Sequence, residues 1–237
     1  MGIKKIYIFT IITILFLYWF YWALRMRNFW RFIIVVGKMG SGKTTYLTKD
    51  AIKYKNRKQL IWDDTSTNKI WKWRKVPLKI YSNSEIKGID YEHFNPIKLG
   101  VSWEPEPYSV LFIDEASIFW SNRKFKSIDE KTLNYMKQLR KHRVRLYLYS
   151  QNFNVDKVMR DLCQEMWLVQ PFMITWSIAR KILKAPTIKE SALDCDSQLV
   201  DNIKFAPFWI HGNLRIIWIP KYIKKFNTYQ KHTAENN

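Results

Sequence analysis

Glycine, lysine and threonine stand at fixed spacing in the segment 37–44, which reads GKMGSGKT. The spacing matches G-x-x-x-x-G-K-[ST], a pattern in which backbone N–H groups surround a phosphate. Lys43 would reach the β- and γ-phosphates of a nucleotide, and the Thr44 hydroxyl would ligate Mg²⁺. The sequence therefore predicts a site for ATP and Mg²⁺. The residues predicted to hold the nucleotide are Gly37, Lys38, Met39, Gly40, Ser41, Gly42, Lys43, Thr44 and Thr45.

Two carboxylates, Asp114 and Glu115, follow a second apolar run at 110–113 (VLFI). An apolar strand that ends in Asp-Glu is the expected partner of a phosphate-binding loop. Asp114 would hold Mg²⁺ through water, and Glu115 would orient or activate the attacking water as a general base. The pair therefore predicts hydrolysis of ATP.

Polar and basic residues around a third apolar segment, 144–149 (VRLYLY), complete the candidate catalytic set. Gln151 follows this segment and could sense the γ-phosphate; a hydrogen bond within the loop is the alternative. Three arginines are candidates for a catalytic finger donated to a neighbouring subunit. They are Arg140, Arg143 and Arg160, and for each of them a surface or DNA-contacting role is the alternative.

Apolar strands alternating with helical segments must position these residues, which predicts an α/β fold with a central, mostly parallel sheet. The class expected is the ASCE or RecA-like P-loop NTPase. We assign the ATPase core to 32–170 and a small β-containing C-terminal extension to 171–232. The extension would contain a hairpin over 208–219, and the tail 233–237 is expected to be disordered.

The run from Ile6 to Leu24 is almost unbroken in its apolar character and has lysine or arginine on both sides. As a helix it would span about 28 Å, one hydrocarbon core. We therefore expect a single-pass transmembrane helix at 6–24, between a short extracytoplasmic tail at 1–5 and a basic linker at 25–31. A cleaved signal peptide is the alternative. The need for cytosolic ATP places the core in the cytoplasm.

The composition is strongly basic, with 40 Lys and Arg against 20 Asp and Glu and a formal net charge of +20. Such a charge predicts an anionic partner, which would be nucleic acid, phospholipid headgroups or both. A solvated basic surface is the alternative. The segment 69–75 (KIWKWRK) interleaves tryptophan with basic residues, which suits single-stranded DNA and a membrane interface about equally. The two cysteines and four histidines show no metal-binding spacing.

The order of the motifs resembles the Zot-like ATPases, the zonular-occludens-toxin domain family that includes the assembly protein of filamentous phages. The resemblance covers 32–230. The segments that carry it are GKMGSGKT at 37–44, YSN at 81–83, VLFIDEAS at 110–117, RKHRVRLYLYSQN at 140–152, DKVMR at 156–160 and FNTYQ at 226–230. In familiar members the membrane helix follows the ATPase, whereas here the apolar run comes first.

The resemblance implies a membrane ATPase that assembles and extrudes filamentous single-stranded DNA phage through the host cytoplasmic membrane. It implies a ring of identical subunits, such as a hexamer, with single-stranded DNA or phage nucleoprotein and phage coat or assembly proteins as partners. It also implies kinship with FtsK/HerA translocases. The alternatives are a DNA packaging or conjugation translocase of the same fold, and an ATP-gated membrane scaffold without motor activity.

Overall fold

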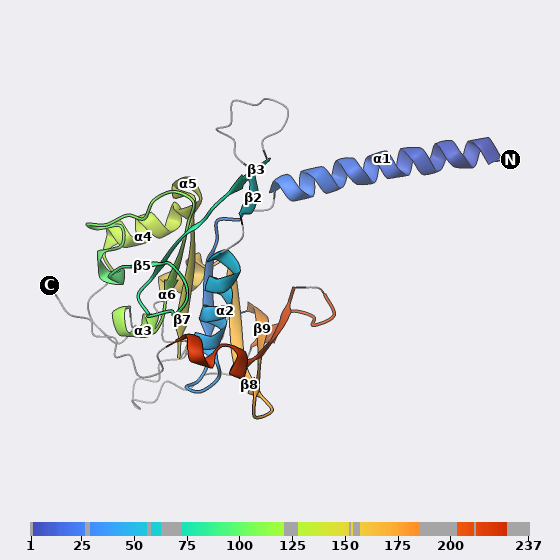
Figure 1. Cartoon of the computed structure of the whole chain (residues 1–237). Helices are drawn as coiled ribbons and strands as arrows, with labels where there is room; N and C mark the ends of the chain where they lie inside the picture. Colours follow the sequence, from blue (N-terminus) through green and yellow to red (C-terminus); the bar gives the residue numbers. More distant parts are fainter. Residues whose placement is uncertain are drawn as a thin grey trace, which may run out of the picture. The chain divides into compact units, whose positions relative to one another are not determined.

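The computed structural model describes residues 2–26, 29–55, 58–62, 73–120, 128–151, 153, 157–184, 203–210 and 212–226. The chain divides into two units. One unit comprises Met1–Phe29 and Leu60–Lys75, and the other comprises Trp30–Gln59 and Val76–Asn237. Figure 1 shows the elements of both.

The smaller unit contains the helix α1 (Gly2–Met26), which includes the apolar run predicted at 6–24. Large apolar side chains from Tyr7 to Phe20 are 46–73% exposed along this helix. In the described part of the chain, no helix has the combined length and apolarity needed to cross a membrane, so the predicted transmembrane helix is not confirmed. The strands β2 (Gln59–Trp62) and β3 (Trp73–Val76) pair with each other. Residues 69–72 of the aromatic-basic segment lie outside the described residues.

The larger unit is built on a sheet with the strand order β10-β9-β8-β1-β7-β6-β4-β5, and β11 also pairs with β9. Its centre is parallel, as the sequence predicts. The central strands are β8 (Glu165–Phe172), β1 (Phe32–Val36), β7 (Val144–Ser150), β6 (Ser109–Ile113) and β4 (Lys79–Ser82), with the short β5 (Glu92–His93) at one edge.

Helices follow most of these strands. The longest in this unit is α2 (Lys43–Lys55), which begins inside the phosphate-binding motif. The apolar spacing at 128–141 predicts one helix. The structure interrupts it at Gln138, which separates α4 (Glu130–Lys137) from α5 (Leu139–His142). The other short helices are α3 (Ala116–Phe119), α6 (Lys157–Leu162) and the 3-10 turn η1 (Pro96–Lys98).

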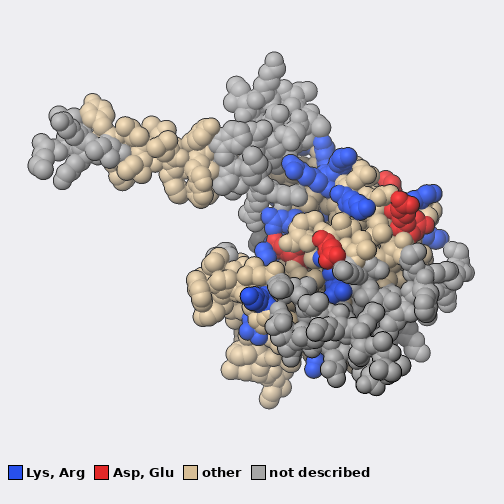
Figure 2. All heavy atoms as spheres, turned by 180° about the vertical axis from the view of Figure 1, so that it is seen from behind, with Lys and Arg blue, Asp and Glu red and all other residues tan. Residues whose placement is uncertain are grey.

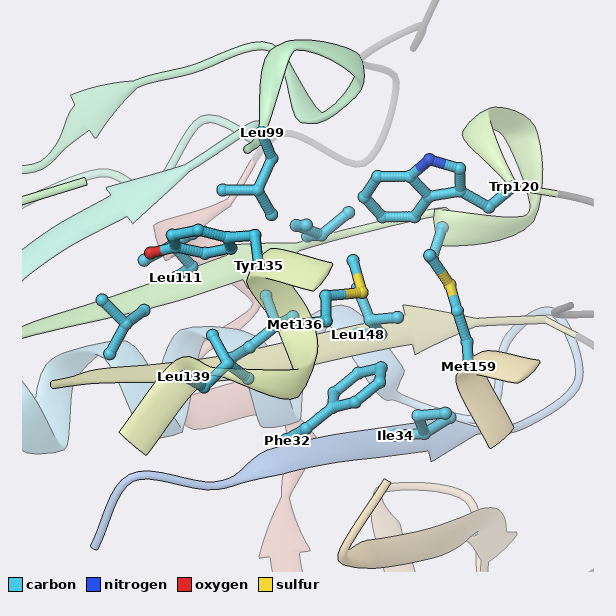
Figure 3. Close-up of a cluster of buried hydrophobic side chains, with 14 of the residues drawn as sticks. Phe32, Ile34, Leu99, Leu111, Trp120, Tyr135, Met136, Leu139, Leu148 and Met159 are labelled. Atoms are coloured by element: carbon cyan, nitrogen blue, oxygen red, sulfur yellow. The ribbon is translucent and has the colours of Figure 1, made fainter. Parts of the chain in front are cut away.

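The two faces of the sheet are packed differently, because successive strand residues point to opposite sides. One face is apolar, and Figure 3 shows Phe32, Ile34 and Leu148 packed with side chains of α4 and α6 such as Met136 and Met159. The face beneath α2 is aromatic and polar. There the hydroxyls of Tyr54 and Tyr147 lie 2.9 Å apart, and Tyr149 donates a 3.4 Å hydrogen bond to Asp50.

The C-terminal part continues the same sheet. β8 runs through position 170 and turns back as β9 (Trp176–Lys184), which pairs with β10 (Lys204–Phe205) and β11 (Leu214–Trp218). The predicted hairpin over 208–219 does not form, since 208–210 is a turn and β11 pairs with β9 instead. The 3-10 turns η2 (Ile219–Lys221) and η3 (Ile223–Lys225) follow. The predicted tail at 233–237 lies outside the described residues.

Candidate nucleotide-binding site

Apart from the three arginines, the predicted site residues directly follow three neighbouring parallel strands. β1, β7 and β6 end at the same edge of the sheet, with Val36 in register with Ser150. The phosphate-binding loop follows β1, Gln151 follows β7, and the Asp-Glu pair follows β6. Parallel strand polarity therefore brings together residues that are more than a hundred positions apart.

The loop at 37–44 is shaped by tight backbone turns and backbone hydrogen bonds. Gly40 and Gly42 have φ angles of 75° and 91°, a region that favours glycine. The Gly37 N–H donates to the Ser150 carbonyl at 3.1 Å, which fixes the start of the loop to β7. The Ser41 N–H donates to the Lys38 carbonyl at 3.1 Å. The loop thus has the tight turns that a phosphate cradle requires.

Lys43 lies at the first position of α2, buried inside the loop. Its ammonium donates to the Lys38 carbonyl at 3.0 Å. Burial lowers the pKa of Lys43, although the carboxylates of Glu115 and Asp114 act in the opposite direction. The lysine is therefore placed where the negative charge of a bound phosphate would offset the free-energy cost of burying its ammonium group. Met39, within the motif, is 81% exposed, and Thr45, directly after it, is buried.

The two predicted Mg²⁺ ligands are adjacent. The Thr44 hydroxyl donates to Oδ2 of Asp114 at 3.3 Å, and Oδ1 of Asp114 accepts from the Glu115 N–H at 3.0 Å. A hydroxyl and a carboxylate oxygen are a donor set that suits Mg²⁺, which binds few protein ligands and completes its shell with water and phosphate. The residues present therefore fit the predicted ion.

Glu115 has a left-handed backbone, with φ 53° and ψ 44°, at the start of α3. Such a conformation costs a residue other than glycine about 1–2 kcal/mol. Its carboxylate accepts a 2.7 Å hydrogen bond from the side-chain amide of Gln151. The predicted general base and the predicted γ-phosphate sensor are thus in direct contact.

The three candidate finger arginines are not brought to the loop of their own chain. Arg143 immediately precedes β7, at the opposite edge of the sheet, where its guanidinium lies 4.9 Å from the Tyr108 ring centre and donates to the Tyr108 hydroxyl. Arg140 is exposed on α5, and Arg160 is half-buried on α6, which leads back to the start of β8. A role in a neighbouring subunit's site stays a prediction for all three.

Two residues outside the predicted set support the site. Ser177, on β9, donates a 2.6 Å hydrogen bond to the Ser41 carbonyl, and a Cβ at Gly42 would lie 3.1 Å from the Ser177 side chain. Asn83, directly after β4, bonds both backbone groups of Asp114. The segment 78–82 (LKIYS) predicts a strand, so the position of Asn83 directly after it is a usable sequence signal. Nothing local in the sequence marks Ser177.

No protein-family model matches the chain, and no curated protein sequence matches it. Among solved structures, the N-terminal domain of zonular occludens toxin from Neisseria meningitidis is similar at 13% identity and TM-score 0.46, over 65% of this chain and 84% of that one. The genome packaging NTPase B204 from Sulfolobus turreted icosahedral virus 2, in complex with sulfate, is similar at 9% identity and TM-score 0.42, over 65% and 92%. The flagellar accessory protein FlaH from Methanocaldococcus jannaschii is similar at 9% identity and TM-score 0.41, over 64% and 77%.

These likenesses, below 25% identity and below a TM-score of 0.5, carry no inference about substrates or partners. The chemistry follows from the site itself. A glycine loop with a buried lysine, a Thr-Asp pair and a glutamate-glutamine pair meet at one edge of a parallel sheet. This is the arrangement that the sequence predicts for a P-loop nucleotide-binding site.

Proposed function

We propose that the chain hydrolyses ATP at this site with Mg²⁺. The observation that carries the proposal is the contact between Gln151 and Glu115 beside the Thr44–Asp114 pair. A base, a sensor and two metal ligands converge there on the lysine that would hold the β- and γ-phosphates. A loop that only binds nucleotide has no need of an aligned base.

Each residue has a defined task in this proposal. Lys43 and the loop N–H groups bind the phosphates, and Thr44 and Asp114 hold Mg²⁺, which would neutralise charge on the phosphate oxygens. Glu115 positions water for attack, and Gln151 links Glu115 to the γ-phosphate. Lys43→Ala should abolish nucleotide binding or turnover. Glu115→Gln should bind ATP but hydrolyse it poorly, and full turnover in that variant would remove Glu115 from the scheme.

We further propose that the ATPase is attached to the host cytoplasmic membrane through its N-terminal segment and powers assembly and extrusion of filamentous single-stranded DNA phage. The apolar run at 6–24 and the exposed apolar side chains of α1 support attachment. The order of the motifs supports the phage role. Phage coat or assembly proteins and a ring of identical subunits belong to the same proposal.

A lysine-rich surface in the larger unit supports an anionic substrate. The α2 lysine surface comprises Lys49, Lys53, Lys55, Lys87, Lys221, Lys224 and Lys225. Backbone contacts hold its segments together: the Lys87 N–H donates to the Lys225 carbonyl at 2.8 Å. Figure 2, seen from behind the view of Figure 1, also shows Lys and Arg side chains at the surface. Phosphates of single-stranded DNA would bind such surfaces in a salt-dependent way.

This surface is also connected to the phosphate-binding loop. Ile219, at the start of η2, lies 3.6 Å from a Cβ built at Gly42, and Lys221, Lys224 and Lys225 follow it within six residues. A displacement of the loop on nucleotide binding would therefore also displace the segment that carries these lysines. We therefore propose that the anionic partner of these lysines, which in this proposal is DNA, is moved when nucleotide binds.

The test is ATP turnover by the full chain in detergent, with and without single-stranded DNA, for the wild type, Glu115→Gln and the triple variant Lys221→Glu/Lys224→Glu/Lys225→Glu. Two results would support the motor. Single-stranded DNA should stimulate an ATP turnover that depends on Glu115, and this stimulation should be lost in the triple variant. Stimulation by double-stranded DNA alone would favour a packaging or conjugation translocase. ATP binding without turnover, even with membranes and coat protein added, would favour the scaffold.

A further inference from the structure

Asn83 forms two hydrogen bonds with the backbone of one residue, Asp114. Its Oδ1 accepts from the Asp114 N–H at 2.7 Å, and its Nδ2 donates to the Asp114 carbonyl at 3.0 Å. Asn83 is 4% exposed, and its own N–H donates to the Phe112 carbonyl at 3.3 Å. The side-chain amide thus continues the β4–β6 pairing beyond the last residues of the two strands.

We propose that Asn83 is a positioning residue for Glu115, the general base of the proposed ATPase reaction. The Asp114 carbonyl belongs to the same peptide group as the Glu115 N–H. Asn83 holds that group at its oxygen, and Asp114 Oδ1 holds it at its N–H. With both ends of the peptide fixed, the direction in which the Glu115 backbone leaves the strand is fixed as well.

The hydrogen bonds from Asn83 hold Glu115 in a backbone conformation that is unfavourable for a glutamate. A left-handed glutamate at φ 53° is less stable than the same residue in an ordinary helical or extended conformation. In this left-handed conformation, the Glu115 carboxylate accepts the 2.7 Å hydrogen bond from Gln151. Released from Asn83, the Asp114–Glu115 peptide could rotate, and Glu115 would relax away from the position of the attacking water.

The turn after Asn83 holds the amide in place. The Ser84 N–H donates to the Ser82 hydroxyl at 3.1 Å, and that hydroxyl donates to the Ser84 carbonyl at 2.9 Å. Asn83 therefore projects from a closed turn rather than a loose loop. A residue that only filled space here would need neither a donor nor an acceptor.

The first variant is Asn83→Ala, measured in the full chain beside the wild type. We expect kcat to fall at least tenfold while the Kd for MgATP, measured by titration, changes less than threefold, because the loop and Lys43 are untouched. A matched control is Asn213→Ala, which removes an amide that donates to the Pro207 carbonyl at 3.0 Å, outside the site. The control should keep wild-type kcat.

The second variant is Asn83→Asp, which makes the test independent of folding losses. An ionised carboxylate only accepts, so it cannot hold the Asp114 carbonyl, but a protonated carboxyl offers one donor and one acceptor, as the amide does. The ratio of its kcat to that of the wild type should therefore rise as the pH is lowered. A merely structural role would change the melting temperature and leave this ratio flat.

The inference rests on the proposed function, and the same assays separate the two. Absence of ATP turnover in the wild type would overturn both. Wild-type turnover with an unchanged kcat in Asn83→Ala, or a ratio for Asn83→Asp that does not vary with pH, would overturn the role of Asn83 alone. If Asn83→Ala fails to fold, the pH dependence of Asn83→Asp decides the question.

Discussion

The side-chain amide of Gln151 donates a 2.7 Å hydrogen bond to the carboxylate of Glu115. The amide that is proposed to sense the γ-phosphate is therefore engaged with the proposed base. A nucleotide phosphate would compete for this donor, so its arrival could release the carboxylate toward water. The contact explains how a bound γ-phosphate and an active base could be coupled.

We predict that Gln151→Ala binds MgATP nearly as well as the wild type but turns over at least tenfold more slowly, a loss of about 1.4 kcal/mol in transition-state stabilisation. Steady-state kinetics and nucleotide titration separate the two effects. Gln138→Ala is the control, because Gln138 is exposed between α4 and α5. Equal kcat in Gln151→Ala and the wild type would show that the amide is a loop contact only.

Lys43 predicts a pH dependence of nucleotide binding. Burial lowers its pKa in the free protein, and a bound phosphate should raise it again. Binding should therefore take up a proton at alkaline pH, and ATP affinity should fall as the pH rises through the lowered pKa. Calorimetric titration in two buffers of different ionisation enthalpy measures the proton. Lys43→Arg should lose the alkaline fall, because arginine stays protonated; the same fall in both proteins would assign it elsewhere.

Glu165 predicts acid sensitivity of the fold. Burial alone would raise its pKa, but Lys181 and Arg31 outweigh burial and lower it. A carboxyl with a lowered pKa in the folded state stabilises the protein fully above its unfolded pKa of about 4.3, and the contribution is lost as the pH falls through the folded value. Glu165→Gln should lower the free energy of unfolding by about 1–2 kcal/mol at neutral pH and flatten its acid dependence.

Urea unfolding followed by tryptophan fluorescence measures this effect across acid pH. Glu92→Gln is the control, because Glu92 is exposed in its 2.7 Å ion pair with Lys79 and such pairs contribute little. If the free energy of unfolding of both variants depends on acid pH as in the wild type, the contacts of Glu165 with Arg31 and Lys181 do not cause that dependence.

The sequence was sufficient for the centre of the site because its signals are local. The loop at 37–44 is one contiguous motif, and the strand before Asp114 is apolar and short, so strand polarity alone predicted that the two would meet. The sequence did not predict which strands would pair when they lie far apart in the chain. The run at 208–219 has two apolar segments around a Gly-Asn turn, yet β11 pairs with β9, whose residues lie some forty positions earlier.

The same limit applies to the residues that support the site. Ser177 reaches the Ser41 carbonyl from a strand that the sequence assigned to an extension, and no spacing rule connects positions so far apart. The interruption of the 128–141 helix at Gln138 was also not predicted, since its apolar periodicity runs through the break. Asn83 was visible at the tip of a strand, but its bonds to Asp114 depend on the register of β4 against β6.

Tyr46 provides a test of how the C-terminal strands support the phosphate-binding loop. It is buried on α2, and its hydroxyl lies 2.9 Å from the Ser177 carbonyl and 2.8 Å from the Arg215 carbonyl. The hydroxyl has one proton, which it can donate to either carbonyl, so it joins the helix that begins in the loop to β9 or to β11. Tyr46→Phe removes this donor and should lower the free energy of unfolding by about 1–2 kcal/mol.

Nucleotide affinity should fall in the same variant, because β9 also holds the loop through Ser177 and a shift of α2 against β9 would disturb Gly42. Thermal melting with and without MgATP measures both effects. Tyr222→Phe is the control, since Tyr222 is only half-buried between η2 and η3. A loss of stability with unchanged ATP affinity would mean that the antiparallel strands stabilise the sheet without shaping the loop.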